Sequence, residues 1–159
     1  MGAEDVMWNA ARARARAQRV LVVDDDAAIR HALRLLLEDE GLVVDEAADG
    51  RTALAMLRAT SDHYVVLLDQ MMPRLDGFGV LSAIAEDARL RSWHNCILIT
   101  ACAQTLPAAL VRLASSLAVP IMAKPFEADE MIATVIERVR RCAVADSVGW
   151  QVEELAQAV

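Results

Sequence analysis

The apolar run at residues 64–68, Tyr-Val-Val-Leu-Leu, is the feature that most constrains how this chain can fold. The run is too short to span a membrane and has the length of a buried β-strand. It ends at a carboxylate, Asp69, and a proline and an Asp-Gly pair follow soon after, which marks a loop. The sequence therefore predicts a strand that holds Asp69 rigidly at its carboxyl end, where the chain leaves the sheet.

Composition limits the classes of function open to the chain. The 159 residues fit one domain, and a hydrophobic fraction of 56% is ample for a packed core. The net charge of -7 gives no general attraction to nucleic acid or to an anionic membrane surface. No apolar run approaches the roughly 20 residues of a membrane span, and the N-terminus lacks the apolar segment of a signal peptide. We therefore expect a cytoplasmic protein with neither nucleic acid nor membrane among its partners.

The basic residues are distributed unusually. Of the 16 basic residues, all are arginine except Lys124. A lone lysine in a chain that otherwise uses arginine suggests a site that requires a compact ammonium group. On composition alone, chance explains the presence of a single lysine equally well.

Cysteine and histidine show no metal-ligand pattern. The cysteines are odd in number and scattered, which predicts reduced thiols rather than a disulfide framework. They are Cys96, Cys102 and Cys142. The histidines lack ligand spacing, so we expect them on helix surfaces and in loops. They are His31, His63 and His94.

Strand and helix patterns alternate five times along the chain. Besides the strand at 64–69, the predicted strands are 19–23, 42–47, 96–100 and 119–123. The predicted helices are 27–40, 51–59, 78–90, 105–117 and 128–142, with a polar loop at 91–95. This alternation predicts a parallel sheet with helices on both faces. Five strands at this length favour an α/β doubly wound (βα)5 three-layer sandwich of the flavodoxin-like class, with strand order 2-1-3-4-5.

The chain divides into three predicted parts, of which residues 19–142 form the main domain. Residues 1–18 are an N-terminal extension with alternating arginine and alanine, for which a solvated tail is favoured over a basic docking arm. Met7 and Trp8 within it are candidate anchors either to the domain itself or to a second subunit, which leaves a homodimer open. Residues 143–159 are a C-terminal tail, too short for a DNA-binding or enzymatic output domain. Its apolar spacing favours a short helix packed on the domain, with an interaction helix or a linker as alternatives.

Acidic residues follow two of the predicted strands. Asp24 and Asp25 come directly after the first strand, and Asp69 ends the third. The predicted order makes these strands neighbours, so their carboxyl ends meet at one edge of the sheet. Thr100 and Lys124 end the fourth and fifth strands and flank the same edge. Three carboxylates repel one another and call for a cation, and oxygen ligands without His or Cys favour Mg²⁺ over zinc.

This set of residues suits the transfer of a phosphoryl group to Asp69. Lys124 and Thr100 are suitable partners for the phosphoryl oxygens on which charge develops. Asp69 is then the nucleophile, and the product is an aspartyl phosphate. The backbone carbonyl of Met71 is placed to be a further metal ligand. Asp26 has a plainer interpretation as a helix N-cap, and the later Asp-Gly pair as a turn that starts a helix.

Five segments of the sequence together resemble the receiver domain of two-component response regulators. The segments are residues 20–26, 67–73, 75–77, 99–101 and 124–126, and the resemblance extends over about residues 19–142. It implies a phosphoacceptor signalling protein, not a conventional enzyme, that receives a phosphoryl group on Asp69 from a histidine kinase or histidine phosphotransfer protein. It also implies that Asp24, Asp25 and Asp69 hold Mg²⁺ and that Thr100 and Lys124 contact the phosphoryl group. The signal would then pass to a protein target by direct contact.

Two features depart from the family pattern. Receivers usually carry Tyr or Phe three residues before the lysine, and that ring turns inward when the threonine moves to the phosphate. Here the position is Ile121, so we expect the signal to travel mainly through loops and helix 105–117. Met71 and Cys102 occupy the positions that tune how water reaches the acyl phosphate. Neither orients water well, so we expect slow hydrolysis without a partner phosphatase.

Two other functions stay open on the sequence. One is a receiver-fold interaction module that no longer needs phosphate. The intact acids, Thr100 and Lys124 argue against it, while Ile121 argues faintly for it. The other is a metal-dependent phosphatase with an Asp nucleophile, which usually adds a cap or a further catalytic acid, and this chain offers no cap.

Overall fold

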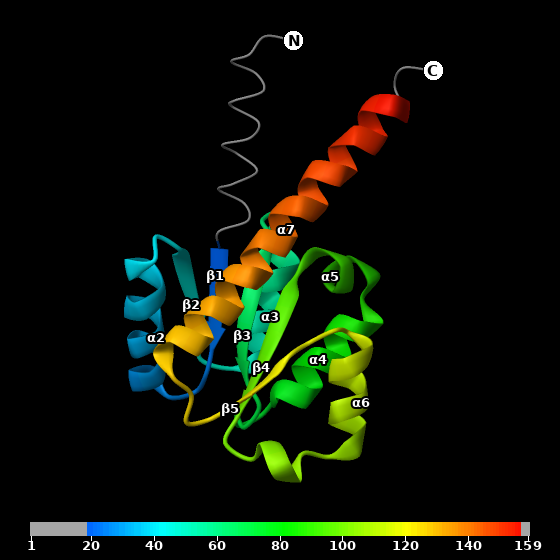
Figure 1. Cartoon of the computed structure of the whole chain (residues 1–159). Helices are drawn as coiled ribbons and strands as arrows, with labels where there is room; N and C mark the ends of the chain where they lie inside the picture. The colour runs from blue at the N-terminus through cyan, green and yellow to red at the C-terminus, as the bar shows by residue number, and fades with distance from the viewer. Residues whose placement is uncertain (1–18, 157–159) are drawn as a thin grey trace.

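The computed structural model describes the backbone of residues 19–156 and the side chains through Cys142. Five parallel strands form one sheet, in the order β2-β1-β3-β4-β5, which confirms the predicted fold class (Figure 1). The strands are β1 (Arg19–Val23), β2 (Val43–Ala47), β3 (Tyr64–Asp69), β4 (Asn95–Thr100) and β5 (Ile121–Ala123). The predictions made for residues 1–18 lie outside the described residues.

Helices cover both faces of the sheet (Figure 1). They are α2 (Ala27–Asp39), α3 (Gly50–Ala59), α4 (Gly77–Glu86), α5 (Ala88–Trp93), α6 (Ala108–Ser116) and α7 (Ala128–Ala156), with a short 3-10 turn, η1 (Ala103–Thr105). One core cluster packs α2 and α7 against the sheet, with Leu37 and Met131 fully buried. The other packs α3, α4 and α6, with Leu57 and Leu110 fully buried. Both faces of the central strands are therefore apolar, which explains why residues 64–68 form a continuous buried run.

Strand register brings the carboxyl ends of β1, β3, β4 and β5 to one edge. Val23 of β1 pairs with Leu68, so Asp69 lies one residue further along beside the turn after β1. Asp69 in turn pairs with Ile99 of β4, and Thr100 pairs with Ala123 of β5. The residues that immediately follow these strands therefore lie close together in space.

The predicted helix 78–90 is interrupted at Asp87, so that two helices, α4 and α5, take the place of one. Asp87 has extended backbone angles, and its carboxylate accepts hydrogen bonds from the N–H groups of Arg89 and Leu90. An aspartate that caps a new helix competes with continuation of the old one. The predicted polar loop 91–95 is accordingly replaced by the end of α5, one linking residue, and the start of β4.

Three other predicted boundaries differ from the structure by more than one residue. The helix predicted at 105–117 begins only at Ala108, because Pro107 is its N-cap and η1 precedes it. The fifth strand is shorter than predicted, since Pro120 lies outside it and only its carbonyl bonds to the sheet, accepting from the N–H of Leu98. Helix α7 continues past Cys142 to Ala156, and Figure 1 shows this part projecting beyond the sheet. The division of the chain at 142 stays a prediction.

His63 and His94 do lie between elements, as predicted, but both side chains are buried. The Nδ1 atom of His94 accepts a hydrogen bond from the N–H of Tyr64, and Nε2 donates to the carbonyl of Leu57, each at 3.2 Å. The His63 ring stacks on Trp93 with 3.8 Å between centroids. These histidines connect α3, α5 and β3 at the amino-terminal ends of the strands, at the opposite end of β3 from Asp69. Within the described residues, no helix is long and apolar enough to cross a membrane.

Candidate functional site

Three carboxylates meet at the carboxyl edge of the sheet. Asp24 and Asp25 follow β1, Asp69 is the last residue of β3, and each offers an oxygen within 4.8 Å of the others. Asp24 and Asp69 are buried, whereas Asp25 is exposed. The N–H of Asp26 donates to Oδ1 of Asp24 at 2.9 Å, which helps to fix the orientation of that carboxylate. The strand order thus brings together the acids that the sequence singled out.

Lys124 bridges two of these acids. Its Nζ lies 2.9 Å from Oδ1 of Asp69 and 3.1 Å from Oδ2 of Asp24. The Lys124 N–H also donates to the carbonyl of Thr100 at 2.7 Å, which ties the lysine to the end of β4. The single lysine of the chain therefore points into the acidic cluster from β5.

Burial and charge act together on the protonation of this site. Burial raises the pKa of Asp69; the hydrogen bond from Lys124 opposes the rise, and the negative charges of Asp24 and Asp25 add to it. Burial alone would lower the pKa of Lys124, but its hydrogen bonds to Asp69 and Asp24 outweigh this and raise the pKa. The pKa of Asp69 rises because burial and its acidic neighbours outweigh the hydrogen bond from Lys124, and the pKa of Lys124 rises because two carboxylates bond to it. One ammonium does not neutralise the cluster.

The charge and chemistry of the cluster fit a divalent cation. Three carboxylates and one ammonium leave two negative charges when all are ionised. The candidate ligands are all oxygen atoms, and among the described residues no histidine or cysteine joins them. Hard cations such as Mg²⁺ prefer such ligands and retain open positions for phosphate oxygens. The acidic cluster could therefore hold a metal ion of this kind.

Thr100 makes a contact that the sequence did not reveal. Its side chain is fully buried, and Oγ1 donates to Oε1 of Gln70 at 2.6 Å. The same oxygen accepts from the N–H of Cys102 at 3.0 Å. Gln70 was not predicted as a site residue, because a glutamine after a strand carries no pattern of its own. The available signal was its place directly after Asp69.

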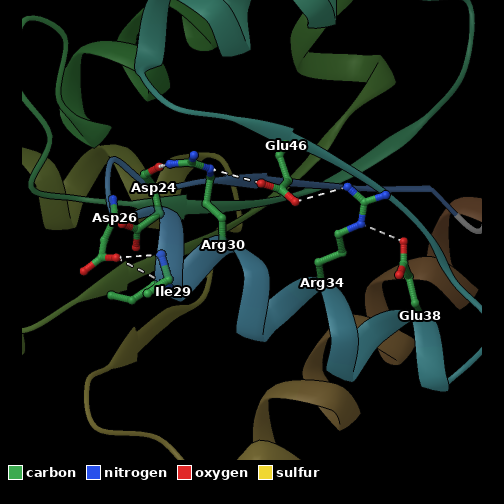
Figure 2. A network of polar contacts seen from close by, with 8 residues as sticks. Asp24, Asp26, Ile29, Arg30, Arg34, Glu38 and Glu46 are labelled. Atoms are coloured by element: carbon green, nitrogen blue, oxygen red, sulfur yellow. Dashed lines mark hydrogen bonds and ion pairs between the residues drawn. The ribbon is translucent and has the colours of Figure 1, made fainter.

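A network of arginine and glutamate residues supports the turn that carries Asp24 (Figure 2). Arg30 of α2 donates from Nη1 to the backbone carbonyl of Asp24 at 2.8 Å and from Nε to Glu46 of β2 at 3.2 Å. Glu46 also accepts from Arg34 at 3.2 Å, so it joins two arginines of α2 to the edge strand. The backbone of Asp24 is thus fixed from outside the acidic cluster.

Asp26 is the N-cap of α2, as predicted. Its Oδ1 accepts from the N–H groups of Ala28 at 2.8 Å and Ile29 at 3.4 Å, as Figure 2 shows for Ile29. Its carboxylate therefore serves the helix N-terminus and leaves the metal-ligand set to its neighbours.

Gly77 allows α4 to approach the strand end that carries Asp69. Asp76 caps α4 by accepting from the N–H of Gly79 at 2.8 Å, which confirms the predicted turn and helix start. A Cβ atom at Gly77 would lie 2.8 Å from both the carbonyl oxygen of Asp69 and Cα of Gln70. The glycine is therefore required by close backbone contact rather than by an unusual φ angle.

The positions that depart from the family pattern lie around the same edge. Ile121 is half-buried and packs against the core cluster that contains α6. Met71 is 65% exposed, and Cys102 is also exposed. An aliphatic side chain thus fills the place of the expected aromatic ring, and two weakly polar side chains lie at the surface beside the strand ends.

Comparison with known proteins assigns the family. Residues 20–136 match the response regulator receiver domain. The chain belongs to this receiver family. Members of this family are signalling phosphoacceptors rather than conventional enzymes. A receiver domain implies a partner histidine kinase.

Curated relatives of this receiver include a transcriptional regulatory protein and a response regulator. The transcriptional regulatory protein DltR of Streptococcus agalactiae is 38% identical over 123 residues, which is 77% of this chain and 52% of DltR. The response regulator MprA of Mycolicibacterium vanbaalenii is 36% identical over 133 residues, which is 82% of this chain and 54% of MprA. The receiver thus spans about half the length of these relatives.

Solved structures of receivers share this fold. A CheY-like receiver domain from Methanospirillum hungatei is 29% identical with a TM-score of 0.69, covering 78% of this chain and 95% of that one. The chemotaxis protein CheY4 of Vibrio cholerae is 27% identical with a TM-score of 0.63, covering 76% of this chain and 97% of that one. The structural match thus extends over nearly all of each isolated receiver.

Proposed function

We propose that this receiver is the phosphoacceptor of a two-component or phosphorelay system and is phosphorylated on Asp69. The observation that carries the proposal is Lys124, whose Nζ bridges Asp69 and Asp24 within the acidic cluster. A carboxylate oxygen of Asp69 attacks phosphorus while the bond to a histidine nitrogen of the donor breaks. The donor is a histidine kinase or a histidine phosphotransfer protein, and the product is an aspartyl phosphate.

The residues around Asp69 have separate roles in this step. Lys124 places an ammonium group where the phosphoryl oxygens develop negative charge, and Thr100 supplies a hydroxyl donor to the same group. Asp24, Asp25, Asp69 and the backbone carbonyl of Met71 would hold Mg²⁺. When bound, the ion neutralises charge on the phosphoryl oxygens. The two uncompensated negative charges of the cluster support this assignment.

A phosphorylation assay tests the proposal. The purified protein is incubated with Mg²⁺ and acetyl phosphate or phosphoramidate, and intact mass spectrometry measures the gain of one phosphoryl group. We expect one group on the wild type and none on Asp69→Ala. Asp76→Ala is the matched control, since Asp76 caps α4 in the loop that follows Asp69. Labelling that persists in Asp69→Ala would overturn the assignment.

We infer that the phosphorylated receiver acts on a protein target by direct contact, in the cytoplasm. The net charge of -7 does not favour nucleic acid. MtrA of Mycobacterium tuberculosis is described as a DNA-binding response regulator, but this chain matches only 51% of its length. Pull-down with beryllofluoride-treated protein, compared with Asp69→Ala, would identify the target.

Ile121 supports a route of signal transmission through the loops and α6. An isoleucine that packs on the α6 cluster has no ring to turn inward, so movement of Thr100 would act through the turn after β4, which leads to α6. Structures of the free and phosphorylated protein would show a shifted α6. An α6 that is unmoved between the two states would contradict this route.

A phosphate-independent interaction module is the second candidate. The observation in its favour is again Ile121, which replaces the usual aromatic side chain. This candidate predicts that Asp69→Ala retains every protein partner of the wild type. The phosphoacceptor function predicts that at least one partner is lost in this variant.

A further inference from the structure

The hydroxyl of Thr100 already takes part in two hydrogen bonds in this structure. A threonine hydroxyl has one proton to donate, and that of Thr100 goes to Oε1 of Gln70 at 2.6 Å. The hydroxyl oxygen is occupied as well, since it accepts from the N–H of Cys102 at 3.0 Å. Thr100 is fully buried, so solvent does not compete for this proton.

The backbone of Gln70 is held in the position from which its side chain reaches Thr100. Its N–H donates to the carbonyl of Ile99 at 2.8 Å, and its carbonyl accepts from the N–H of Gly77 at 2.9 Å. These two bonds anchor Gln70 between β4 and the start of α4. Its side-chain amide is joined to this backbone through rotatable bonds, which those two hydrogen bonds do not restrain.

We propose that Gln70 is a positioning residue that withholds the Thr100 hydroxyl from the phosphoryl site until Asp69 is modified. This inference rests on the proposed function. A phosphoryl oxygen on Asp69 and Oε1 of Gln70 compete for the same proton, so the Thr100 hydroxyl bonds to one at the expense of the other. The Gln70–Thr100 hydrogen bond therefore contributes to the free-energy cost of activation. Because Ile121 has no aromatic ring to mark the active state, the released amide of Gln70 marks it instead.

The test measures binding of beryllofluoride with Mg²⁺, since beryllofluoride on Asp69 imitates the phosphoryl group. Gln70→Met keeps a side chain of similar length but has no strong acceptor, and Gln70→Ala is a second variant. Relief of one competing hydrogen bond should tighten binding by about two- to tenfold in either variant. Gln104→Ala, an exposed glutamine of η1, is the matched control and should bind like the wild type.

A double-mutant cycle separates this role from a general effect on the loop. Thr100→Val removes the hydroxyl while keeping the shape of the side chain. In the Thr100→Val background, Gln70→Met should leave the beryllofluoride affinity unchanged, because no proton is left to compete for. A gain that persists in that background, or a Gln70→Met affinity equal to or weaker than that of the wild type, would overturn the inference.

NMR of the wild-type side-chain amides gives an independent readout. The Gln70 amide resonances should shift when beryllofluoride binds, as its oxygen loses the Thr100 donor. If the protein binds beryllofluoride but the Gln70 amide resonances do not shift, this inference is refuted and the proposed function is not. Absence of beryllofluoride binding in the wild type would instead refute the proposed function on which it rests.

Discussion

The ammonium nitrogen of Lys124 lies 2.9 Å from Oδ1 of Asp69, although the two residues are 55 positions apart in the chain. The same nitrogen also contacts Asp24, so it stands between the proposed nucleophile and a proposed metal ligand. Removing this cation should therefore affect phosphorylation and metal binding in opposite directions.

Lys124→Met is expected to slow phosphorylation by about a hundredfold, because the developing charge on the phosphoryl oxygens loses a fixed donor. Mg²⁺ should bind more tightly to this variant, since a competing positive charge is gone. Rates with phosphoramidate and a Mg²⁺ titration check both effects. Arg112→Met, an exposed cation of α6, should change neither quantity. Weaker Mg²⁺ binding by Lys124→Met would contradict the electrostatic argument.

Asp25→Asn and Asp26→Ala should separate metal binding from helix capping. Asp25 belongs to the acidic cluster, so its amide variant should lose Mg²⁺ affinity. Asp26 caps α2, so its loss should lower the free energy of unfolding by about 1 kcal/mol while Mg²⁺ affinity is retained. Mg²⁺ titration and urea denaturation of both variants provide the measurements. An equal loss of Mg²⁺ affinity in the two variants would refute the distinction.

Gly77→Ala should lower both the free energy of unfolding and the Mg²⁺ affinity of the acidic cluster. The new Cβ would meet backbone atoms of Asp69 and Gln70 at 2.8 Å, and relieving such overlap typically costs about 1–3 kcal/mol. Because the backbone of Asp69 would have to move, Mg²⁺ affinity should fall as well. Gly41→Ala is the control: its φ of +77° makes alanine cost about 1–2 kcal/mol, but it should leave Mg²⁺ affinity unchanged. Unaltered Mg²⁺ binding by Gly77→Ala would exclude this steric account.

Acid should destabilise the protein through His94. Burial lowers the pKa of His94 from 6.5 to about 4, so between these values the unfolded chain takes up a proton that the folded chain excludes. The contribution of neutral, buried His94 to the free energy of unfolding is fully present above pH 6.5 and is progressively lost as the pH falls towards 4. Between pH 6.5 and 5 the free energy of unfolding should drop by roughly 2 kcal/mol.

Urea denaturation across this pH range measures the effect. His94→Gln should be less stable at pH 7 and should show a smaller drop on acidification. His31→Asn, at an exposed position of α2, should keep the wild-type pH dependence. A drop of the same size in His94→Gln would assign the acid sensitivity to other groups.

The aspartyl phosphate should persist beyond seconds without a phosphatase. Met71 and Cys102 are exposed and offer little hydrogen bonding to orient an attacking water. Loss of label after removal of the donor measures the lifetime. Met71→Asn, which supplies an amide, should shorten it, and Val111→Asn at an exposed position of α6 should not. Decay of the wild-type phosphate within seconds would contradict this expectation.

The sequence by itself determined the architecture and the acidic cluster. Alternating apolar runs and amphipathic helices specify a doubly wound sheet, and that order makes the ends of β1 and β3 neighbours. The positions of Asp24, Asp25 and Asp69 follow from strand ends, which local patterns show. Local capping was also readable at Asp26, whereas the same chemistry at Asp87 was missed inside an apolar periodicity.

Only the tertiary structure decided which distant polar groups form hydrogen bonds with one another. The Thr100–Gln70 bond joins residues 30 positions apart, and the His94–Leu57 bond joins residues 37 apart. Arg30 reaches Glu46, 16 positions away, because α2 folds back beside β2. No periodicity encodes such pairs. They arise because buried polar groups must find partners after the chain has packed, and the packed geometry selects those partners.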